Sequence, residues 1–555
     1  MSLLERRIGL LFALFALALC VVVARASWLQ GVRGSELRAD AQSQQIETVV
    51  VPGSRGAILD RTGTELAVSE DAATIFATPY QVEDPPRTAE KLAEVLDADP
   101  DELLELLTSP DSGFQYIARK VDLPTAERVR KLRLAGIGTL ADSRRIYPQG
   151  ELASQVIGAV GVDNNGLTGL EASHEEILHG TAGEREIVRD ALGKELERNT
   201  LASADAGSDL RLTIDASLQA RTEEVLAGLA ETYDPKGATA IVIDPRSAEV
   251  LALANYPAAD PSDPGGATPE ELANRATGYT YEPGSTFKAF TVAGALEEGI
   301  VTPETPFSLP PTIQVADRVI EESHPRGAVT LSVADILAQS SNVGAVTIGL
   351  EVGAERFDHW IREFGFGSPT GVDFPGEEQG IVLRPSEYSG STMGNLPIGQ
   401  GLSVTPIQMA AAYSAIANGG VLRTPRVVLE EGGEPAEAGD RRRVISRRNS
   451  AKLREMLRGV LAPGGTASEV SVPGYTLAGK TGTAQKVVDG VYSDSRFVAS
   501  FVGFAPAEDP QLLVSVVVDE PQGDYYGGTV AAPAFGEIAK FALPYLGIEA
   551  GGKGR

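Results

Sequence analysis

The stretch YEPGSTFKAF, residues 281–290, sets a serine and a lysine three positions apart at the start of a predicted helix. A proline and a glycine break regular structure just before Ser285, and an apolar helical pattern then continues to a stop at Gly299. Ser285 is therefore expected at a helix N-terminus, with Lys288 one turn later on the same face. A serine hydroxyl needs a nearby proton acceptor to become a nucleophile, and a desolvated lysine can be neutral enough to serve.

This spacing alone is weak support for a catalytic pair, because roughly one such match arises by chance in a chain of this length. Ser285 and Lys288 nevertheless form the only Ser-Xaa-Xaa-Lys match in the sequence. Lysine is scarce relative to arginine, and only Lys288 falls between Lys236 and Lys452. Lysine can lose its proton whereas arginine keeps it, so a lysine here fits a base, although codon composition explains the scarcity equally well.

A second polar cluster interrupts the apolar segment ILAQSSNVGAV, residues 336–346. It places Ser340, Ser341 and Asn342 between two apolar helical runs, which is the spacing of a Ser-Xaa-Asn motif. The alternative interpretation is the end cap of one helix followed by the N-cap of the next.

A third cluster follows an apolar strand in YTLAGKTGTAQK, residues 475–486. The structural interpretation of this cluster is a strand end with a glycine for close backbone approach. The functional interpretation is that Gly482 lets a substrate pair along the strand edge. Lys480 and the hydroxyls of Thr481 and Thr483 then meet a carboxylate.

The order of the three clusters carries more weight than any one of them. Ser-Xaa-Xaa-Lys, Ser-Xaa-Asn and Lys-Thr-Gly follow one another in the order found in penicillin-binding proteins and serine β-lactamases. Over nearly its whole length the sequence resembles the class B, monofunctional penicillin-binding proteins, and most closely their division-specific branch. The resemblance is carried by RGAILDRTGTELAVS, YPQGELASQVIGAVGVDNNGLTGLE, LTIDASLQ, YEPGSTFK, QSSN, PIGQGLSVTPIQMAAAYSAIANGG and GKTGTAQ.

The resemblance implies a peptidoglycan D,D-transpeptidase that crosslinks stem peptides through an acyl-enzyme. Ser285 would be acylated by the penultimate D-Ala carbonyl of a stem peptide, and Lys288 would take the serine proton. Ser340 would relay a proton to the leaving amine, and Asn342 would hold the donor amide. The residues implied to bind the substrate carboxylate and backbone are Lys480, Thr481, Gly482 and Thr483.

The same resemblance implies an oxyanion hole made by the backbone N–H groups of Ser285 and Thr483, inhibition by β-lactams, and no cofactor. No equivalent of the deacylating glutamate of one β-lactamase class is recognisable, so trapping by β-lactams is expected. The implied partners are peptidoglycan stem peptides, the membrane, a SEDS-type glycan polymerase and other division proteins. The N-terminal motif residues have an implied structural role, with coupling of the two domains as one option: Arg55, Gly56, Asp60, Gly63, Gly169, Glu171 and Asp190.

Composition excludes several other classes of protein. A net charge of -28 argues against nucleic-acid binding, which depends on neutralising phosphates with lysine and arginine. One cysteine, Cys20, and four scattered histidines have no metal-ligand spacing, so no metal site is expected.

The apolar run at residues 8–24 is the only segment of membrane-spanning length, and we interpret it as an uncleaved anchor. A cleaved signal peptide is the main alternative, because residues 24–26 have the A-x-A form, and a lipoprotein interpretation through LALC is weaker. The positive-inside rule does not settle orientation, since arginines lie on both sides: Arg6 and Arg7 before the run, and Arg25, Arg33 and Arg38 after it.

The sequence predicts an α+β chain of more than one domain, ending in an antiparallel sheet of five strands covered by helices. Within it we expect hairpins over 51–69 and 238–255, a strand pair at 496–506 and 511–521, helices over 88–106 and 124–134, and a further helix capped by Asp215 or Ser217. The predicted parts are a cytoplasmic tail (1–7), a membrane anchor (8–24), a connector (25–47), a pedestal domain (48–208), a transpeptidase domain (209–547) and a C-terminal tail (548–555).

Five other functions are alternatives at this point. An elongation-type transpeptidase or a D,D-carboxypeptidase would use the same site residues. A non-enzymatic divisome scaffold would use only the anchor and pedestal. A bifunctional glycosyltransferase is disfavoured because residues 25–210 carry no acidic glycosyltransferase motif, and a β-lactam sensor because there is a single apolar segment.

Overall fold

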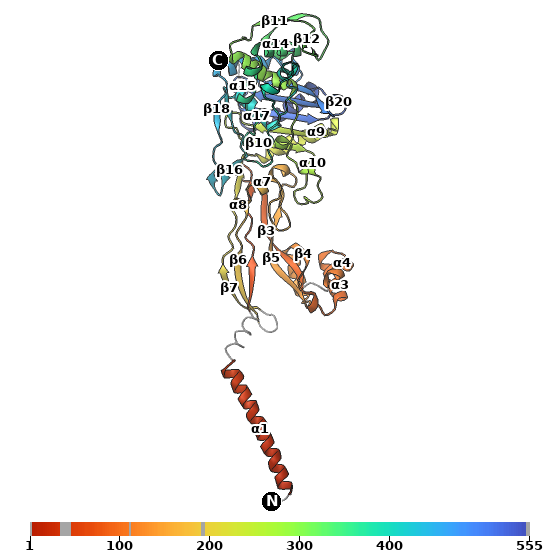
Figure 1. Cartoon of the computed structure of the whole chain (residues 1–555), viewed down its shortest axis with the longest axis vertical. Helices are drawn as coiled ribbons and strands as arrows, with labels where there is room; N and C mark the ends of the chain where they lie inside the picture. The colour runs from red at the N-terminus through yellow and green to blue at the C-terminus, as the bar shows by residue number, and fades with distance from the viewer. Residues whose placement is uncertain (1–2, 34–45, 110–112, 190–194, 551–555) are drawn as a thin grey trace. The chain divides into compact units, whose positions relative to one another are not determined.

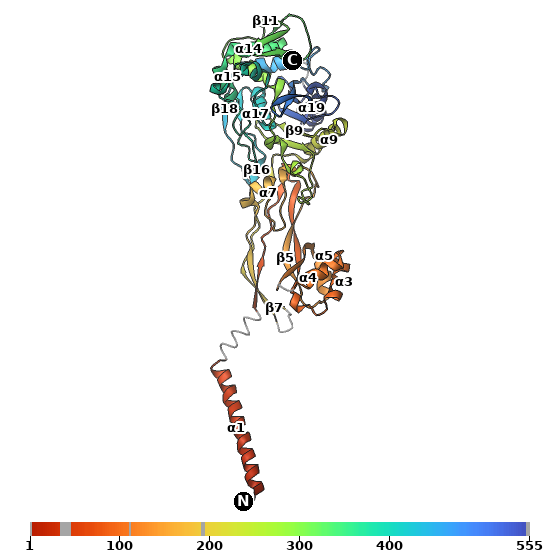
Figure 2. The same ribbon diagram turned by 45° about the vertical axis from the view of Figure 1, so that its right-hand side comes forward.

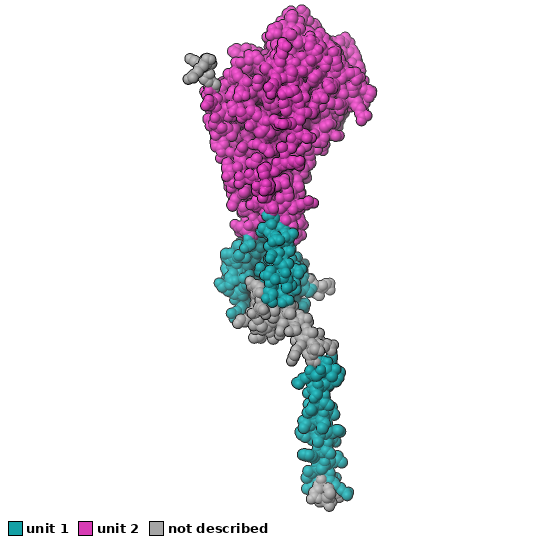
Figure 3. All heavy atoms as spheres, turned by 90° about the vertical axis from the view of Figure 1, so that its left-hand side faces the viewer, with its two compact units in different colours: residues 1–54, 71–143, 180–207 teal, residues 55–70, 144–179, 208–555 magenta. Residues whose placement is uncertain are grey.

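The computed structural model describes residues 3–33, 46–109, 113–189 and 195–550. The chain forms two compact units, drawn in teal and magenta in Figure 3. Unit 1 comprises Met1–Ser54, Asp71–Ser143 and Gly180–Gly207, and unit 2 comprises Arg55–Glu70, Arg144–His179 and Ser208–Arg555. Two segments from the predicted pedestal, 55–70 and 144–179, thus group with the C-terminal part of the chain.

Unit 1 begins with the helix α1 (Leu3–Gly31), which extends beyond the predicted apolar run at both ends (Figure 1). Within the described residues this is the one helix long and apolar enough to cross a membrane, and its apolar side chains are exposed. Near its C-terminal end the Arg25 guanidinium lies 4.8 Å from the ring centre of Trp28, a pairing suited to a membrane interface. The helix therefore fits a single-pass membrane anchor.

The rest of unit 1 holds a sheet of three antiparallel strands and a cluster of helices. The sheet has the order β1-β6-β7, with β1 (Ile46–Val51), β6 (Gly183–Arg189) and β7 (Glu195–Ala202). The helical cluster packs around buried Ile75, Leu92, Leu103 and Val129. Its elements are η1 (Pro79–Gln81), α3 (Pro85–Leu96), α4 (Pro100–Leu107), β4 (Gln115–Asp122) and α5 (Leu123–Lys131).

The single helix predicted over 88–106 is wrong, because the chain breaks there into α3 and α4. Asp97 adopts a left-handed conformation with φ 54, which ends α3. The side chain of Asp99 then accepts a hydrogen bond from the N–H of Asp101, and Pro100 occupies the first position of α4. The helix predicted over 124–134 is present as α5.

The predicted hairpin over 51–69 is confirmed by the antiparallel pairing of β2 (Ile58–Leu59) with β3 (Glu65–Ala77). Its turn is held by Asp60, whose carboxylate accepts N–H bonds from Thr62 at 2.7 Å and Thr64 at 2.8 Å. Gly63 has φ +94 in this turn, a conformation that favours glycine.

A buried ion cluster ties the two N-terminal segments of unit 2 together. Glu171 accepts from Arg55 Nε at 2.5 Å and from Arg145 Nε at 2.7 Å, with all three side chains at most 3% exposed. Arg145 also donates to the Gly56 carbonyl at 2.7 Å, and Arg55 pairs with Glu175 at 2.6 Å. These contacts fit the structural role that the resemblance implies for Arg55 and Glu171. Asp190 of the same predicted set lies outside the described residues.

The central sheet of unit 2 has five strands, every neighbouring pair antiparallel, which confirms the predicted fold class. Both predicted strand pairs are present in it. The strand order is β10 (Val250–Tyr256), β9 (Gly237–Ile243), β21 (Leu512–Asp519), β20 (Val491–Ala505) and β19 (Ala478–Val488).

Helices cover both faces of this sheet, which explains why β21 is buried along its whole length. The helices α9 (Ala216–Tyr233) and α19 (Gly527–Tyr545) pack on one face, α9 against β10 and β9 and α19 against β20 and β21, and Figure 2 shows the two helices next to each other. The other face is covered by α17 (Pro406–Ala417), α11 (Arg275–Gly278) and the turn η2 (Gly284–Phe287). Alternate residues of β9 enter the two cores: Ala240 and Val242 enter one, and Ile241 and Ile243 the other. Of the two caps predicted for α9, the structure uses Asp215.

The remaining elements of unit 2 surround this core. The helices are α6 (Ser154–Ile157), α7 (Gly169–Ser173), α8 (Glu175–Leu178), α10 (Pro269–Leu272), α12 (Lys288–Glu297), α13 (Val333–Ala338), α14 (Asn342–Val352), α15 (Ala354–Glu363), η3 (Pro385–Glu387), α16 (Thr392–Asn395), η4 (Leu396–Ile398) and α18 (Arg447–Arg458). The strands are β8 (Leu210–Leu212), β11 (Pro306–Leu309), β12 (Thr312–Val315), β13 (Arg318–Glu321), β14 (Val329–Ser332), β15 (Val421–Arg423), β16 (Val428–Glu431), β17 (Glu434–Pro435) and β18 (Arg441–Arg443). The strand β5 (Ile137–Ile146) pairs with β3 and lies mostly in unit 1, with its last residues in unit 2.

Candidate active site

Ser285 lies in η2, a single 3-10 turn that leads directly into α12 at Lys288. The predicted helix therefore begins with a tighter turn than expected. Gly284 has φ +55, and a side chain there would come within 3.1 Å of the Thr483 carbonyl, so glycine lets η2 lie against β19. Ser285 is half-buried and lines a cavity.

Lys288 is completely buried behind Ser285 and makes three hydrogen bonds from Nζ. These go to the Ser340 carbonyl at 2.6 Å, to Asn342 Oδ1 at 2.6 Å and to Ser340 Oγ at 3.2 Å. Burial lowers the pKa of Lys288 to about 7, and the negative charge of Glu322 opposes part of this shift. The structure thus joins the first two predicted motifs through one amine.

The loop between α13 and α14 contains the N-cap of the structural interpretation, and it also brings Ser340 and Asn342 of the Ser-Xaa-Asn motif to Lys288. Ser340 has a left-handed φ of 60, which turns its hydroxyl and carbonyl toward Lys288. Ser341 is the N-cap of α14, since its side chain accepts from the N–H of Gly344 at 3.0 Å. The caps that end one helix and start the next therefore also position Asn342.

The third motif lies within β19, the edge strand of the sheet, and not at a strand end. Lys480 is completely buried, and burial, with a smaller contribution from the positive charge of Lys288, lowers its pKa well below the usual value. Thr481 Oγ1 lies 2.7 Å from Thr466 Oγ1, and Thr483 Oγ1 accepts from the N–H of Gly527 at 3.0 Å. Among the described strands only β20 pairs with β19, so its other edge has the backbone groups to which a peptide could be added.

Gly482 is needed for packing within the protein itself. A Cβ at this position would lie 2.3 Å from Ser500 Oγ and 2.9 Å from the Pro283 carbonyl. Glycine therefore lets the turn that carries Ser285 approach the strand that carries Lys480 and Thr483.

The three motifs meet at a cavity of about 460 Å³, with the two buried lysines beneath it. The predicted residues Ser285, Ser340, Asn342, Thr481 and Thr483 line it. Further polar and aromatic residues line the cavity that the sequence did not single out, and all but Thr529, in the first turn of α19, come from loops with no pattern of their own: Ser323, His324, Thr466, Ser468, Glu469, Tyr526 and Thr529.

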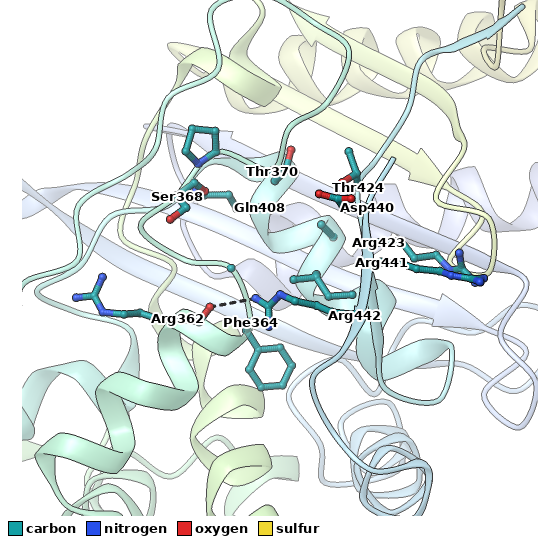
Figure 4. A pocket seen from close by; sticks show the side chains of 14 residues that line it. Arg362, Phe364, Ser368, Thr370, Gln408, Arg423, Thr424, Asp440, Arg441 and Arg442 are labelled. Carbon is teal, nitrogen blue, oxygen red and sulfur yellow. Dashed lines mark hydrogen bonds between the residues drawn. The ribbon is translucent and has the colours of Figure 1, made fainter. Parts of the chain in front are cut away.

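A second cavity of about the same volume contains none of the predicted site residues (Figure 4). Its wall includes Arg362 and Arg442, and Arg442 donates to the Arg362 carbonyl at 3.2 Å and pairs with Glu363 at 2.6 Å. Phe364 and Ala411 form its apolar floor. Volume does not distinguish the two cavities, whereas the three predicted motifs line only the first. Within the described residues no group of three or more His, Cys, Asp or Glu side chains could hold a metal ion.

A five-stranded antiparallel sheet covered by helices, with the Ser-Xaa-Xaa-Lys, Ser-Xaa-Asn and Lys-Thr-Gly motifs gathered at one edge, is the arrangement of serine acyl-transfer enzymes that recognise β-lactams. The family model described as the penicillin binding protein transpeptidase domain matches residues 238–540, and that of the penicillin-binding protein dimerisation domain matches residues 50–212. The chain belongs to the class B penicillin-binding proteins, as the sequence resemblance implied, and is a serine-type peptidoglycan D,D-transpeptidase.

Several curated relatives match over most of their own length. The stage V sporulation protein D of Bacillus subtilis is 36% identical over 556 residues, covering 97% of this chain and 86% of the relative. The peptidoglycan D,D-transpeptidase FtsI of Escherichia coli K12 is 32% identical over 551 residues, covering 98% of this chain and 92% of the relative. The crystal structure of penicillin binding protein 3 from Mycobacterium tuberculosis with ampicillin has a TM-score of 0.72 and 29% identity, covering 91% of this chain and 98% of that one.

Proposed function

We propose that the chain crosslinks septal peptidoglycan during cell division, through an acyl-enzyme on Ser285. The observation that supports this most strongly is Lys288, a buried amine that hydrogen-bonds Ser340 and Asn342, two residues that line the same cavity as Ser285. A pKa of about 7 leaves a large share of this amine unprotonated near neutral pH, so it can accept a proton.

In the proposed acylation, Ser285 Oγ attacks the penultimate D-Ala carbonyl and Lys288 takes the hydroxyl proton. The new Oγ–C bond forms as the C–N bond to the terminal D-Ala breaks. Ser340 Oγ, 3.2 Å from Lys288 Nζ, returns the proton to the leaving amine. The N–H groups of Ser285 and Thr483 stabilise the oxyanion, where losing one donor typically costs a hundredfold or more in rate. An amine from a second stem peptide then attacks the acyl carbonyl and releases Ser285.

The donor peptide is proposed to pair along the open edge of β19. Its carboxylate would meet the hydroxyls of Thr481 and Thr483 and the amine of Lys480. A carboxylate close to Lys480 favours the protonated amine, which burial disfavours in the free enzyme. Asn342 would hold the donor amide once its bond to Lys288 rearranges.

The cellular role is proposed from the relatives. FtsI of E. coli and penicillin binding protein 3 of M. tuberculosis, which was crystallised with ampicillin and with aztreonam, support a septal enzyme inhibited by β-lactams. With α1 as anchor, the catalytic unit would face outward, where peptidoglycan lies. A SEDS-type glycan polymerase is the proposed membrane partner. Depletion in the native bacterium should give filaments, whereas round or swollen cells would indicate an elongation role.

The reaction is tested by D-amino-acid exchange. The full chain in detergent is incubated with a stem pentapeptide ending in D-Ala-D-Ala and a fluorescent D-amino acid, beside Ser285→Ala. If the wild type incorporates the label and Ser285→Ala does not, the result supports transfer to an amine. Ser285-dependent release of D-Ala without incorporation would make the protein a D,D-carboxypeptidase. No reaction by the folded wild type would favour the scaffold role.

A further inference from the structure

Glu322 is a buried carboxylate next to the active site that the proposed acylation does not use. It follows β13, and its side chain is 7% exposed. Its Oε1 accepts from the Ser341 hydroxyl at 2.6 Å, and its Oε2 accepts from the N–H of Asn342 at 2.6 Å. Arg326 pairs with it at 2.5 Å.

These contacts hold Asn342 at three of its polar atoms. Its backbone N–H donates to Glu322 at 2.6 Å, its Nδ2 donates to the Glu321 carbonyl at 2.8 Å, and its Oδ1 accepts from Lys288 at 2.6 Å. Glu322 therefore anchors the backbone of the residue whose side chain binds the proposed base.

Glu322 also occupies a favourable electrostatic position. It lies at the N-terminus of α14, an eleven-residue helix whose first N–H groups attract negative charge. The negative charge of Glu322 favours the protonated amine of Lys288 and so opposes the effect of burial. Lys480 on β19 is a second buried amine, and the positive charge of Lys288 contributes to the lowered pKa of Lys480. Arg326 in turn screens Glu322.

We propose that Glu322 is a positioning residue of the transpeptidase reaction, which holds Ser341 and Asn342 at the start of α14 so that the Asn342 side chain meets Lys288. The inference rests on the proposed function, since it takes Lys288 as the base. It assigns the segment after the β12–β13 hairpin a part in the chemistry, although this segment carries none of the three motifs.

The test is the rate of Ser285 acylation by benzylpenicillin, measured by intact mass from pH 5.5 to pH 9. In Glu322→Gln the midpoint of the acid limb should move to lower pH by about half a unit to one unit, because the neutral amine is no longer disfavoured by a nearby negative charge. The plateau rate should also fall. In Arg326→Gln the midpoint should move the opposite way, because Glu322 is then less screened.

The control is Asp317→Asn, which removes one exposed negative charge from the turn of the same hairpin and should leave the midpoint unchanged. A purely structural role would lower the Glu322→Gln rate equally at every pH, and this result would overturn the proposal. A midpoint that stays in place or falls in Arg326→Gln would overturn it too, even if Glu322→Gln does not fold. Absence of any adduct on the wild type would instead contradict the proposed function.

Discussion

The pH dependence of acylation tests whether Lys288 is the base. Burial lowers the pKa of this amine from its ordinary 10.5 to about 7. The neutral fraction of such an amine is about 0.09 at pH 6 and about 0.9 at pH 8. The acylation rate should therefore rise roughly tenfold between these values and level off above pH 8.

An unperturbed lysine would behave differently in the same assay. With a pKa of 10.5 the neutral fraction rises about a hundredfold from pH 6 to pH 8 and continues to rise beyond pH 9. Stopped-time intact mass spectrometry with benzylpenicillin distinguishes the two profiles. Lys288→Arg keeps a cation at this position but offers no neutral amine, so its plateau rate should fall by about a hundredfold to ten-thousandfold. A rate that still climbs tenfold per pH unit above pH 8 would refute the reasoning.

Three further predictions concern stability. Between pH 7 and pH 9.5 the unfolded wild-type chain keeps a proton on Lys288 that the folded chain has lost, so the free energy of unfolding of the wild type rises with pH. Lys288→Met lacks this titration, so its free energy of unfolding relative to the wild type should be about 3 kcal/mol higher at pH 7 than at pH 9.5. Chemical unfolding at both pH values checks this. Gly482→Ala should lose about 1 to 3 kcal/mol and slow acylation, since its Cβ overlaps Ser500 Oγ at 2.3 Å, whereas Gly228→Ala in α9, with open space around it, should not destabilise. Glu171→Ala should cost about 3 to 5 kcal/mol, because the buried Arg145 loses its carboxylate partner and Arg55 keeps only Glu175, against at most about 1 kcal/mol for the exposed Glu224→Ala. Equal melting temperatures for these two variants would contradict the cluster's role.

Much of the fold was predictable because its signals are local. The strand pairs that build the central sheet appear as apolar runs on either side of a turn, as at Asp244 between β9 and β10. The three motifs were found by spacing and order, and the structure brings them to one cavity. The break between α3 and α4 at Asp97 was not predicted, because the apolar periodicity continues across it, although Asp99 and Pro100 are residues typical of a helix start.

The supporting parts of the site were not predictable from the sequence. Glu322 and Thr466 act through contacts with residues 19 and 15 positions away, and neither lies in a repeated or periodic pattern. The ion cluster around Glu171 likewise depends on Arg55, 116 positions distant. Such pairings are set by tertiary packing, so a single sequence carries no local signal for them. At Ser341 the local sequence correctly predicted a helix N-cap, but it carried no signal for the contact of Ser341 with Glu322.

The central claim is a covalent acyl-enzyme on Ser285, and the most direct measurement is the intact mass of the full chain after incubation with benzylpenicillin, run beside Ser285→Ala. The account predicts a stable mass increase of one benzylpenicillin on the wild type and none on the variant. A folded wild type that gains no mass, or a Ser285→Ala variant that gains the same mass, would contradict it.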